Sequence, residues 1–459
     1  MRHGMAGHQM TIDQMELPLE SRGEAPRAER RGEADPTTCG PERSGNDDLM
    51  AEVVERTNLA RALKRVRRNQ GSAGVDGMTV DELGPYLRDH WAGIREALLA
   101  GTYQPSAVRQ HQIPKPDGRV RTLGIPTVLD RFIQQAVLQV LQPRFDPTFS
   151  ESSHGFRPGR RAHDAVCQAQ RYAQSGRRWV VDIDLEQFFD RVHHDILLGK
   201  LHQRITDRRV LALIRRYLEA GMMANGVVHE RTEGTPQGGP LSPLLANVLL
   251  DEVDQALERR GHCFVRYADD CNVYVRSKRA GERVMQALGG LYAKLRLRIN
   301  PAKSAVARVW ERSFLGFSFW VAPGRVVKRR VAPKALATMK DRVRAITSRN
   351  GGRSLGAVMT ALRSYLVGWK AYFRLADTPR VLAGVDQWVH RRLRMLLLKQ
   401  WKCGRTIYRE LQRRGVNGAA LAMAAKFGRS WWHVAAHPAL HIALPATYFE
   451  SLGLPRLAR

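Results

Sequence analysis

The sequence has few cysteines and no long apolar segment, and both shortages narrow the classes of protein to which it can belong. Its five cysteines are scattered, at Cys39, Cys167, Cys263, Cys271 and Cys403. They form no C-x-x-C pair that would indicate zinc and no disulfide framework, which fits a reducing compartment. The N-terminus lacks the apolar region of a secretory signal, and no apolar run or lipidation motif indicates a membrane anchor. We therefore expect a cytoplasmic protein with no membrane partner.

Acidic residues are also scarce relative to basic ones. The 459 residues include 74 Lys and Arg and 44 Asp and Glu, which gives a formal net charge of +30 and a pI of about 10.8. The excess is concentrated in residues 321–459, which hold 27 Lys and Arg but 5 Asp and Glu, a net charge of +22. Such an excess predicts a polyanionic partner. The length suffices for about three domains of ~150 residues.

Local patterns predict a largely helical chain with a few strands and no internal repeat. The first 48 residues are polar and mix Arg, Glu, Gly and Pro, which favours a disordered leader. Apolar spacing predicts helices at 49–66, 127–141, 161–172, 196–219, 244–260 and 281–295. A further helix is expected after Thr79, with Glu82 at the capping-box position. Strands are expected around a turn within 103–125 and at 314–319, and the pattern after Pro333 is helical, basic and interleaved with tryptophan.

Two adjacent carboxylates stand at the tip of a predicted β-hairpin. Residues 263–267 and 271–275 are rich in Val, Tyr and Phe, which favours strands, and the small or acidic residues between them suit a tight turn. Asp269 and Asp270 repel one another there unless the turn is well solvated or a cation lies between them. For an isolated pair, a solvated acidic turn is at least as good an interpretation as a metal site.

A second acidic feature, on a different predicted strand, favours the metal. Residues 179–184 (W-V-V-D-I-D) read as a buried strand, and Asp182 and Asp184 share one of its faces because strand side chains alternate. Buried carboxylates are costly unless they are paired or bind a metal. Phe188 and Phe189 follow closely, and one of them is expected to belong to the core.

The remaining motifs suit the handling of phosphates. A turn at 115–118 (K-P-D-G) is flanked by Lys115, Arg119 and Arg121, which suit either a solvated face or a grip on phosphate. Residues 234–243 (G-T-P-Q-G-G-P-L-S-P) form a loop whose glycines let the backbone approach a ligand. Nucleotidyl transfer needs such parts, because two Mg²⁺ ions ~3.5–4 Å apart clamp the reacting phosphate and must be held by carboxylates from separate strands.

The order of these pieces resembles the group II intron-encoded reverse transcriptase/maturase family. The likeness runs from about Asn58 to the C-terminus and is carried by eight blocks in family order. The blocks are Q-G-S-A-G-V-D-G-M-T, I-P-K-P-D-G-R-V-R-T-L-G-I-P-T, S-S-H-G-F-R-P-G-R, V-D-I-D-L-E-Q-F-F-D, G-T-P-Q-G-G-P-L-S-P-L-L-A-N, Y-A-D-D, N-P-A-K-S and F-L-G-F. Four residues such as Y-A-D-D recur by chance, whereas eight ordered blocks are a specific signal.

The resemblance implies an α+β fold with the architecture of a right-hand polymerase. Fingers and palm with an antiparallel sheet are expected at 49–320, a helical thumb at 321–385 and a helical maturase segment at 386–459. The catalytic and metal-binding residues carried over are Asp184, Asp269 and Asp270, with Mg²⁺ as the cofactor. Asp184 is preferred to Asp182 because the family places an aromatic residue five positions after the catalytic Asp, where Phe189 stands.

Nucleotide-binding roles are implied for Lys115, Arg121, Phe189 and Gln237. Lys115 and Arg121 match positions that hold the incoming triphosphate, and Gln237 matches a residue lining the nucleotide pocket. Phe189 matches the steric gate against the ribose 2′-hydroxyl, which favours dNTPs over NTPs. Lys303 and Gly316 match later palm positions of less certain role. A turn-stabilising amide is the alternative for Gln237, and a core residue is the alternative for Phe189.

The implied activity is RNA-directed DNA polymerisation combined with assistance to intron splicing and mobility. Expected partners are group II intron RNA, an RNA template with a DNA primer, dNTPs and target DNA, in a bacterial-type cytoplasm, nucleoid or intron ribonucleoprotein. Two alternatives stay open, a splicing-only RNA-binding maturase and a host-adopted reverse transcriptase in repair or defence. The family's H-N-H nuclease is absent. His433, His437 and His441 are spaced four apart, but Pro438 disfavours one continuous helix, so packing or RNA contact is favoured over a metal.

Overall fold

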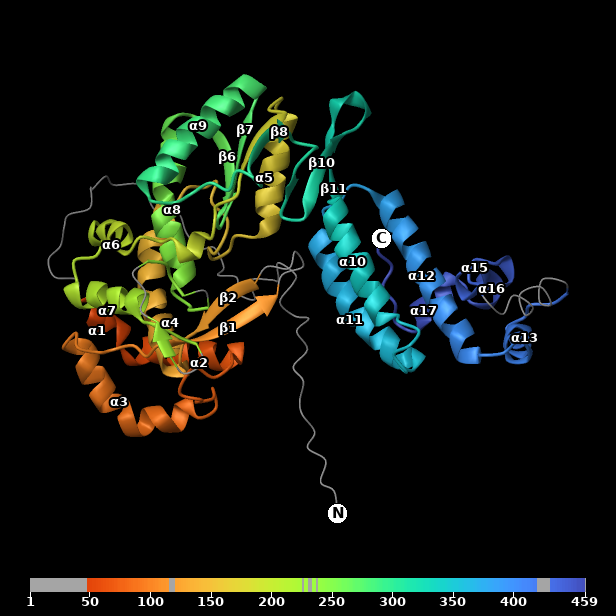
Figure 1. The fold of residues 1–459 in the computed structure, drawn as a ribbon, viewed down its shortest axis with the longest axis horizontal. Helices are drawn as coiled ribbons and strands as arrows, with labels where there is room; N and C mark the ends of the chain where they lie inside the picture. Colours follow the sequence, from red (N-terminus) through yellow and green to blue (C-terminus); the bar gives the residue numbers. More distant parts are fainter. Residues whose placement is uncertain are drawn as a thin grey trace, which may run out of the picture. The chain divides into compact units, whose positions relative to one another are not determined.

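The chain divides into two compact units, which meet in the sequence between Arg308 and Val309. The computed structural model describes residues 48–114, 120–224, 227–229, 233–236, 238–418 and 430–458. The predicted leader, apart from Asp48, lies outside these residues. Figure 1 shows the helices and strands of both units.

The first unit contains most of the strands. Its helices are α1 (Leu49–Val53), α2 (Arg56–Asn69), α3 (Leu83–Leu99), α4 (Val128–Phe145), α5 (Ala162–Gln174), α6 (His194–His202), α7 (Arg208–Glu219), α8 (Ser242–Arg259) and α9 (Lys278–Lys294), with short 3₁₀ turns η2 (Asp146–Thr148) and η3 (Phe188–Asp190). Its strands are β1 (Val108–Pro114), β2 (Val120–Ile125), β3 (Trp179–Ile183), β4 (Met222–Ala224), β5 (Val227–His229), β6 (Cys263–Tyr267), β7 (Asp270–Val275) and β8 (Ala305–Arg308).

One antiparallel sheet, in the order β6-β7-β3-β8, organises the first unit. Its alternating side chains form two faces, as strand geometry requires. One face bears Val181, Val273 and Val275 and joins the main hydrophobic core beneath α9. Gly281 of α9 lies against Val181, Val275 and Val306, so the helix approaches the strands closely. The opposite face bears Asp182 and Tyr274, and α5 packs there through a Tyr172–Tyr274 ring contact.

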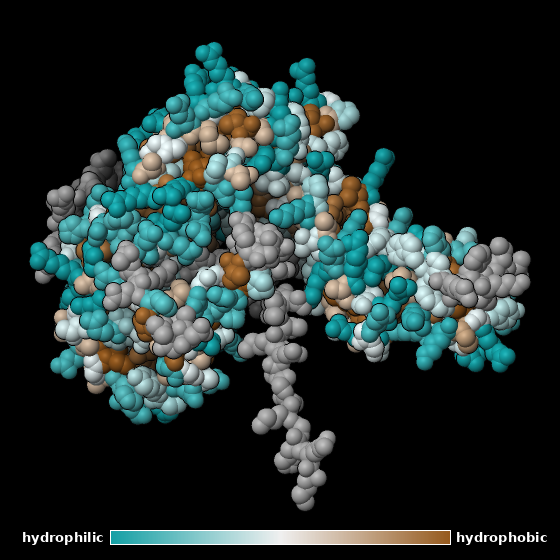
Figure 2. Space-filling model, in the orientation of Figure 1, coloured by the Kyte–Doolittle hydropathy of each residue, from teal (hydrophilic) through white to brown (hydrophobic). Residues whose placement is uncertain are grey.

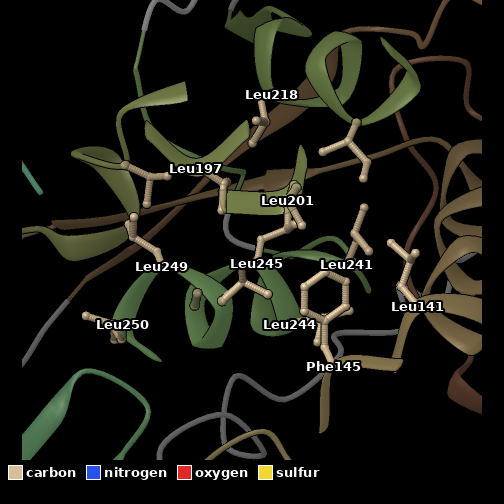
Figure 3. Packing of buried hydrophobic residues seen from close by; sticks show 14 of the residues in the cluster. Leu141, Phe145, Leu197, Leu201, Leu218, Leu241, Leu244, Leu245, Leu249 and Leu250 are labelled. Carbon is tan, nitrogen blue, oxygen red and sulfur yellow. The ribbon is translucent and has the colours of Figure 1, made fainter. Parts of the chain in front are cut away.

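The core continues below this sheet between helices. Leucines of α6, α7 and α8 meet the end of α4, and Figure 3 shows their side chains converging. Residues there include Leu141, Phe145, Leu197, Leu201, Leu218, Leu241, Leu244, Leu245, Leu249 and Leu250, each at most 2% exposed. Because apolar residues lie almost all round α8, that helix is buried along its length and provides a rigid support behind the β6–β7 hairpin.

A second sheet, β2-β1-β4-β5, contains the predicted basic hairpin. Strands β1 and β2 pair antiparallel from Arg109–Ile125 to Pro114–Val120, and β1 pairs with β4 in parallel. The 115–119 turn between β1 and β2 lies outside the described residues. The hairpin predicted within 103–125 is therefore present, while the turn residues expected to grip phosphate are not described.

The second unit is a small sheet followed by helices. Its elements are β9 (Ser313–Phe314), β10 (Phe317–Val321), η4 (Pro323–Arg325), β11 (Val327–Val331), α10 (Pro333–Ile346), α11 (Leu355–Phe373), α12 (Pro379–Trp401), α13 (Gly404–Arg413), α15 (Trp431–Val434), α16 (Pro438–Ala443) and α17 (Ala446–Ser451). Its sheet has the order β11-β10-β9. Phe373 of α11 packs between Phe317 and Trp369, with ring centroids 5.1 and 4.7 Å away, which fixes α11 against the sheet.

Several predicted elements differ in their limits. The helices expected at 49–66 and 196–219 are each two helices, and the strand expected at 314–319 is interrupted by Leu315 and Gly316, both with positive φ. The cap expected at Thr79 is wrong, because α3 begins at Leu83. The Thr79 hydroxyl and amide both donate to Glu82, at 2.8 and 2.7 Å, so the two residues form a turn ahead of the helix.

The visible surface of both units is largely hydrophilic, with small scattered apolar patches (Figure 2). Among the described residues, no helix combines the length and the hydropathy needed to cross a bilayer.

Candidate active site

The acidic residues singled out in the sequence lie at one end of the first unit's antiparallel sheet. Strands β6 and β7 form the predicted hairpin, in which Tyr267 pairs with Asp270 around the turn. Strand β3 runs beside β7 with Ile183 opposite Cys271, and one further step along each strand brings Asp184 level with Asp270. Residues separated by about ninety positions are thereby brought to the same end of the sheet.

These carboxylates influence one another electrostatically. The pKa of Asp270 is raised to about 7, first by burial and then by the charges of Asp269, Asp182 and Asp184, while Lys303 acts to lower it. Asp270 is nonetheless exposed on one side, so solvent or substrate can reach it. Like charges gathered in this way disfavour ionisation, and a nearby cation favours it.

Asp184 is fixed by the turn at residues 300–304, the N-P-A-K-S block. Its amide donates to Ser304 Oγ at 2.9 Å, and its carbonyl accepts the Asn300 amide at 2.8 Å. From the same turn, Lys303 Nζ contacts both Asp184 carboxylate oxygens at 3.2 and 3.1 Å. Asp182 has a different partner, because the side-chain amide of Asn272 donates to Asp182 Oδ1 at 2.7 Å. The geometry therefore separates the two acids of β3.

The donor set suits a hard divalent cation. Carboxylate oxygens are the ligands that Mg²⁺ prefers, and that ion commonly takes only one or two of them and completes its shell with water and substrate phosphate. In the described part of the chain, no group of three or more His, Cys, Asp or Glu side chains is arranged to hold a metal ion. The Lys303 ammonium on Asp184 is the cation that the protein itself supplies.

Phe188 and Phe189 have distinct environments. Phe188 is 3% exposed and belongs to the core, whereas Phe189 is only partly buried and packs at the edge of the core. The Phe189 ring contacts Phe188 edge-on at 5.1 Å between centroids and Phe156 at 6.5 Å. The Phe189 carbonyl accepts the Thr235 amide at 2.7 Å, which ties it to the glycine-rich loop. The expectation that one of the pair is core is confirmed for Phe188.

The other predicted nucleotide-binding residues are not described fully enough to be located. Lys115 and Gln237 lie outside the described residues. Arg121 contributes its backbone to β2, opposite Ile113, but its side chain is likewise not described.

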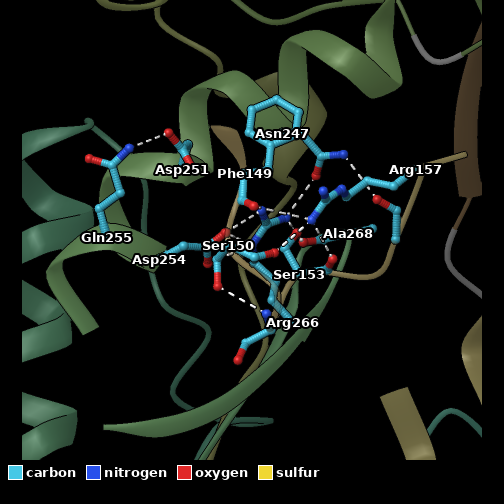
Figure 4. A network of polar contacts seen from close by, with 12 residues as sticks. Phe149, Ser150, Ser153, Arg157, Asn247, Asp251, Asp254, Gln255, Arg266 and Ala268 are labelled. Atoms are coloured by element: carbon cyan, nitrogen blue, oxygen red, sulfur yellow. Dashed lines mark hydrogen bonds and ion pairs between the residues drawn. The ribbon is translucent and has the colours of Figure 1, made fainter. Parts of the chain in front are cut away.

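A buried polar network behind the hairpin was not predicted from the sequence. Arg266 of β6 has no exposed surface, and its guanidinium bonds both carboxylate oxygens of Asp254 on α8 at 2.5–2.9 Å. Its Nη1 donates to Asn247 Oδ1 and to the Ala268 carbonyl, both at 2.9 Å (Figure 4). Burial lowers the pKa of Arg266, and Asp254 outweighs that effect, so the pKa is raised and the guanidinium stays charged.

This network holds the backbone that carries the two aspartates. Ala268 has φ +57°, a left-handed conformation that costs a residue with a Cβ about 1–2 kcal/mol. The Arg266 bond to the Ala268 carbonyl offsets that cost and fixes the turn immediately before Asp269. The sequence signal for this network is an arginine inside an apolar strand (F-V-R-Y).

In the second unit, basic side chains gather over tryptophans. Three cations face the ring of Trp388 on α12, with Lys340 at 5.9 Å and Arg344 and Arg392 at 5.7 Å from its centroid. Arg391 lies 4.1 Å over Trp432 and also donates to its carbonyl at 3.0 and 2.8 Å. Trp369, by contrast, is 2% exposed and is a core residue.

An arginine-lined notch adjoins Trp388. It has a volume of about 230 Å³ and is lined by Arg344, Ser348, Arg349, Asn350, Arg392 and Met395. Burial lowers the pKa of Arg392, and the charges of Arg344 and Arg349 lower it further. Guanidinium groups crowded in this way attract an anion, so we name the surface formed by Arg344, Arg349, Arg392 and Trp388 the arginine notch.

The three C-terminal histidines do not share one helix. His433 lies in α15, and His437 caps α16, where its Nδ1 accepts the Ala439 amide at 3.2 Å. His441, inside α16, contacts Arg394 Nη1 at 3.2 Å. The expected break at Pro438 is confirmed, and the local contacts are those of packing.

Comparisons with known proteins agree with this arrangement. Residues 113–319 match the family described as reverse transcriptase (RNA-dependent DNA polymerase), and residues 336–415 match the group II intron, maturase-specific domain. Protein YkfC of Escherichia coli (strain K12) is 32% identical over 302 residues, which cover 57% of this chain and 79% of YkfC.

Two further similarities cover less. Group II intron-encoded protein LtrA of Lactococcus lactis subsp. cremoris is 38% identical over 195 residues, which span 42% of this chain and about a third (32%) of LtrA. A solved structure, the partial Cas6-RT-Cas1--Cas2 complex, is 25% identical over 54% of this chain and 42% of its own, with a TM-score of 0.35, too low to support a conclusion.

The fold and the two matched domains define a reverse transcriptase followed by a maturase domain. The chain belongs to the group II intron-encoded reverse transcriptase/maturase family, whose activities are RNA-directed DNA polymerisation and assistance to intron splicing and mobility. The expected α+β class is confirmed. The two domains imply nucleic-acid partners, and the reverse transcriptase family generally uses divalent metal ions.

Proposed function

We propose that this chain extends a DNA primer along an RNA template with dNTPs and Mg²⁺, and that Asp184, Asp269 and Asp270 hold the metal. The observation that carries the proposal is the convergence of these acids at one sheet end, where burial and then their mutual repulsion raise the pKa of Asp270 to about 7. Carboxylates kept together at such a cost are well suited to bind a divalent cation.

Each part of the site has a definite task in this reaction. Bound Mg²⁺ would lower the pKa of the primer 3′-hydroxyl and stabilise the leaving pyrophosphate. Ser304 and Asn300 orient Asp184 through its backbone. Lys303 neutralises part of the acidic charge and, by lowering the pKa of Asp270, favours its ionised form at neutral pH. The Arg266 network keeps the Asp269–Asp270 turn in one conformation.

Selection of the nucleotide is assigned to Phe189, Lys115, Arg121 and Gln237. Phe189 supports its role as a steric gate by standing partly exposed beside the glycine-rich loop, while Phe188 fills the core. The roles of the other three follow from their matching motif positions. We assign fingers and palm to residues 49–320, thumb to 321–385 and the maturase segment to 386–459.

The decisive experiment is primer extension on an RNA template with dNTPs and Mg²⁺. We expect Asp269→Ala to abolish extension by the purified protein. Asp195→Ala is the matched control, because Asp195 is an exposed carboxylate that pairs with Arg215 on the surface at 2.7 Å. Extension by Asp269→Ala at the normal rate would refute the metal assignment.

A second task, recognition of group II intron RNA, is favoured by the arginine notch and the basic tryptophan-rich helices. Phosphate contacts and aromatic stacking are the usual means by which proteins bind structured RNA. We propose that the second unit binds the intron RNA during splicing, and that the enzyme acts with target DNA in a cytoplasmic intron ribonucleoprotein. Salt-sensitive intron binding by a wild-type protein without extension activity would instead identify a splicing-only maturase.

A host-adopted reverse transcriptase would have the same active site. It would extend primers but would show no preference for intron RNA over an unrelated structured RNA of equal length. Competition between those two RNAs for the purified protein separates that alternative from the proposed function.

A further inference from the structure

The loop at 154–159 (H-G-F-R-P-G) is anchored firmly on both sides of Phe156. After it, Arg157 is 7% exposed, and its guanidinium donates six hydrogen bonds to residues within 146–153. Its Nε donates to Asp146 Oδ1 at 2.9 Å, and its Nη1 donates to the carbonyls of Ser150 and Ser153 at 2.6 and 3.0 Å. Figure 4 shows Arg157 beside the Arg266 network. The loop is thus held as rigidly as a core segment.

On the other side of Phe156, the loop is joined to the hairpin that carries the catalytic aspartates. The His154 amide donates to the Arg266 carbonyl at 2.9 Å, and Asn247 Nδ2 donates to the Gly155 carbonyl at 2.9 Å. A Cβ on Gly155 would lie 2.1 Å from the Ala268 nitrogen, so only glycine permits this approach. Asn247 therefore bonds both the loop and Arg266, and connects the loop to the aspartate turn.

Held between these anchors, Phe156 adopts an unfavourable conformation. Its φ is +61°, and 42% of its surface is exposed. A bulky residue in this region is strained, and such strain persists where the surrounding structure imposes it, often at functional sites. The exposure of an aromatic ring to water is also unfavourable. In this conformation the Phe156 ring lies 6.5 Å from that of Phe189 between centroids, at an interplanar angle of 63°, the edge-to-face geometry that aromatic rings favour.

We propose that Phe156 is a positioning residue that determines the sugar specificity of the polymerase by fixing the Phe189 ring. Phe189 is contacted on its core side by Phe188 and on its exposed side by Phe156. A gate acts only if its ring does not retreat when a ribose 2′-hydroxyl presses on it. Contact with Phe156 prevents that movement. Because the loop that carries Phe156 is bonded to the aspartate turn, the Phe189 ring and the metal-binding acids keep a fixed relative position. The inference rests on the proposed gate role of Phe189.

The test measures single-nucleotide incorporation and compares kcat/KM for a dNTP with that for the matching NTP. Phe156→Asn removes the ring while keeping a residue that tolerates positive φ, so the loop is preserved. We expect the preference for the dNTP to fall roughly 3- to 10-fold, the equivalent of losing one aromatic pair contact. Phe156→Tyr, which keeps the ring, should retain the preference, and the thermal midpoint of both variants should stay near that of the wild type.

Three further measurements make the outcome decisive. Phe189→Ala should lower the same preference more strongly, and Phe156→Asn added to Phe189→Ala should cause no further loss, because both act through one ring. If Phe189→Ala leaves the preference unchanged, the gate itself is wrong. If Phe189→Ala lowers the preference and Phe156→Asn does not, the gate stands and the role of Phe156 is refuted. Additive losses would also refute it, since Phe156 would then act independently of Phe189.

Discussion

The two units differ in charge balance and in the surroundings of many of their arginines. In the first, residues 1–308 hold 46 Lys and Arg against 38 Asp and Glu, and the most buried arginines, Arg157 and Arg266, are surrounded by carboxylates and carbonyls. In the second, residues 309–459 hold 28 Lys and Arg against 6 Asp and Glu. There, guanidinium groups lie over Trp388, Trp401 and Trp432.

The difference distinguishes arginines that stabilise the fold from arginines whose charge is placed to contact a ligand. A buried arginine with its donors satisfied fixes a backbone, and here that backbone bears the aspartates proposed to be catalytic. An arginine beside a half-buried tryptophan places its positive charge near the surface, where that charge attracts a polyanion. The family has two activities, and arginine contributes to each in a different electrostatic setting. Substitutions in the first unit should therefore impair primer extension, and substitutions in the second unit should impair RNA binding.

The largest effect is expected from Arg266→Met. Removing one partner of a buried, bonded ion pair leaves Asp254 uncompensated, which typically costs about 3–5 kcal/mol. We expect chemical denaturation to show this loss in the first unit, with primer extension lost in parallel. Arg391→Met in the second unit is the comparison, because its two bonds to Trp432 are partly exposed and should contribute about 1 kcal/mol. Equal losses from the two variants would remove the distinction between the units.

Gly155→Ala should disturb the aspartate turn by a steric route. Because the added methyl would meet the Ala268 backbone, one of the two segments must move, at a cost of about 1–3 kcal/mol. The rate of primer extension should fall by more than the loss of stability alone explains, because the displaced segment carries Asp269. Gly199→Ala on α6 is the matched control, where a methyl meets no atom within 4 Å and helix propensity gains about 0.5–1 kcal/mol. A fully active Gly155→Ala enzyme would contradict the proposed link.

Asp251→Asn should stabilise the first unit in a pH-dependent way. Asp251 is 7% exposed, and burial, followed by the charge of Asp254, raises its pKa to about 6. The unfolded chain ionises near pH 4, so the wild type loses stability as the pH rises from about 4 to 6, and the variant escapes that loss. The gain should be about 1–3 kcal/mol at pH 8 and absent below about pH 4. Thermal melts at both pH values measure it, and a gain of equal size at both would show that the charge of Asp251 is not its cause.

The smallest change in stability is expected from Arg349→Gln in the arginine notch. Arg349 is exposed, so the melting temperature should hardly move. RNA affinity should weaken, and the slope of its logarithm against that of salt concentration should decrease by about 1 for each lost phosphate contact. Arg215→Gln, an exposed arginine of the first unit that pairs with Asp195, should leave the slope unchanged. Equal slopes for both variants would exclude a phosphate at the notch.

Features written in local sequence were predictable. The hairpin around Asp269 and Asp270 and the strand before Asp184 follow from alternation and composition, and the structure has both. The eight sequence blocks, in family order, also identified the family. Limits of elements were less predictable, because tertiary contacts decide them. The Thr79 amide donates to the Glu82 carboxylate, as in one half of a capping box, yet α3 begins only at Leu83.

Features that depend on long-range pairing could not be read from the sequence. Arg266 in an apolar strand is recognisable as an internal arginine only when Asp254 and Asn247 are known to face it. Phe156 lies in a basic loop without helical or strand periodicity, and its local sequence indicates neither a positive φ nor a contact with Phe189. Burial of charge and backbone strain are properties of the assembled fold.

The left-handed turn at Ala268 also bears on how the protein folds. Arg266, two positions away, supports this turn directly, whereas the site around it is assembled from distant parts of the chain, since the Asn247–Gly155 bond spans 92 positions and the Asp184–Ser304 bond spans 120. Contacts between residues so far apart in the sequence form slowly, because closing a long loop costs conformational entropy before the contact stabilises it. During refolding, helical content should therefore return before catalytic competence. Recovered polymerase activity would mark the last native contacts to form, and a chain still being synthesised cannot be active before residue 304 has emerged.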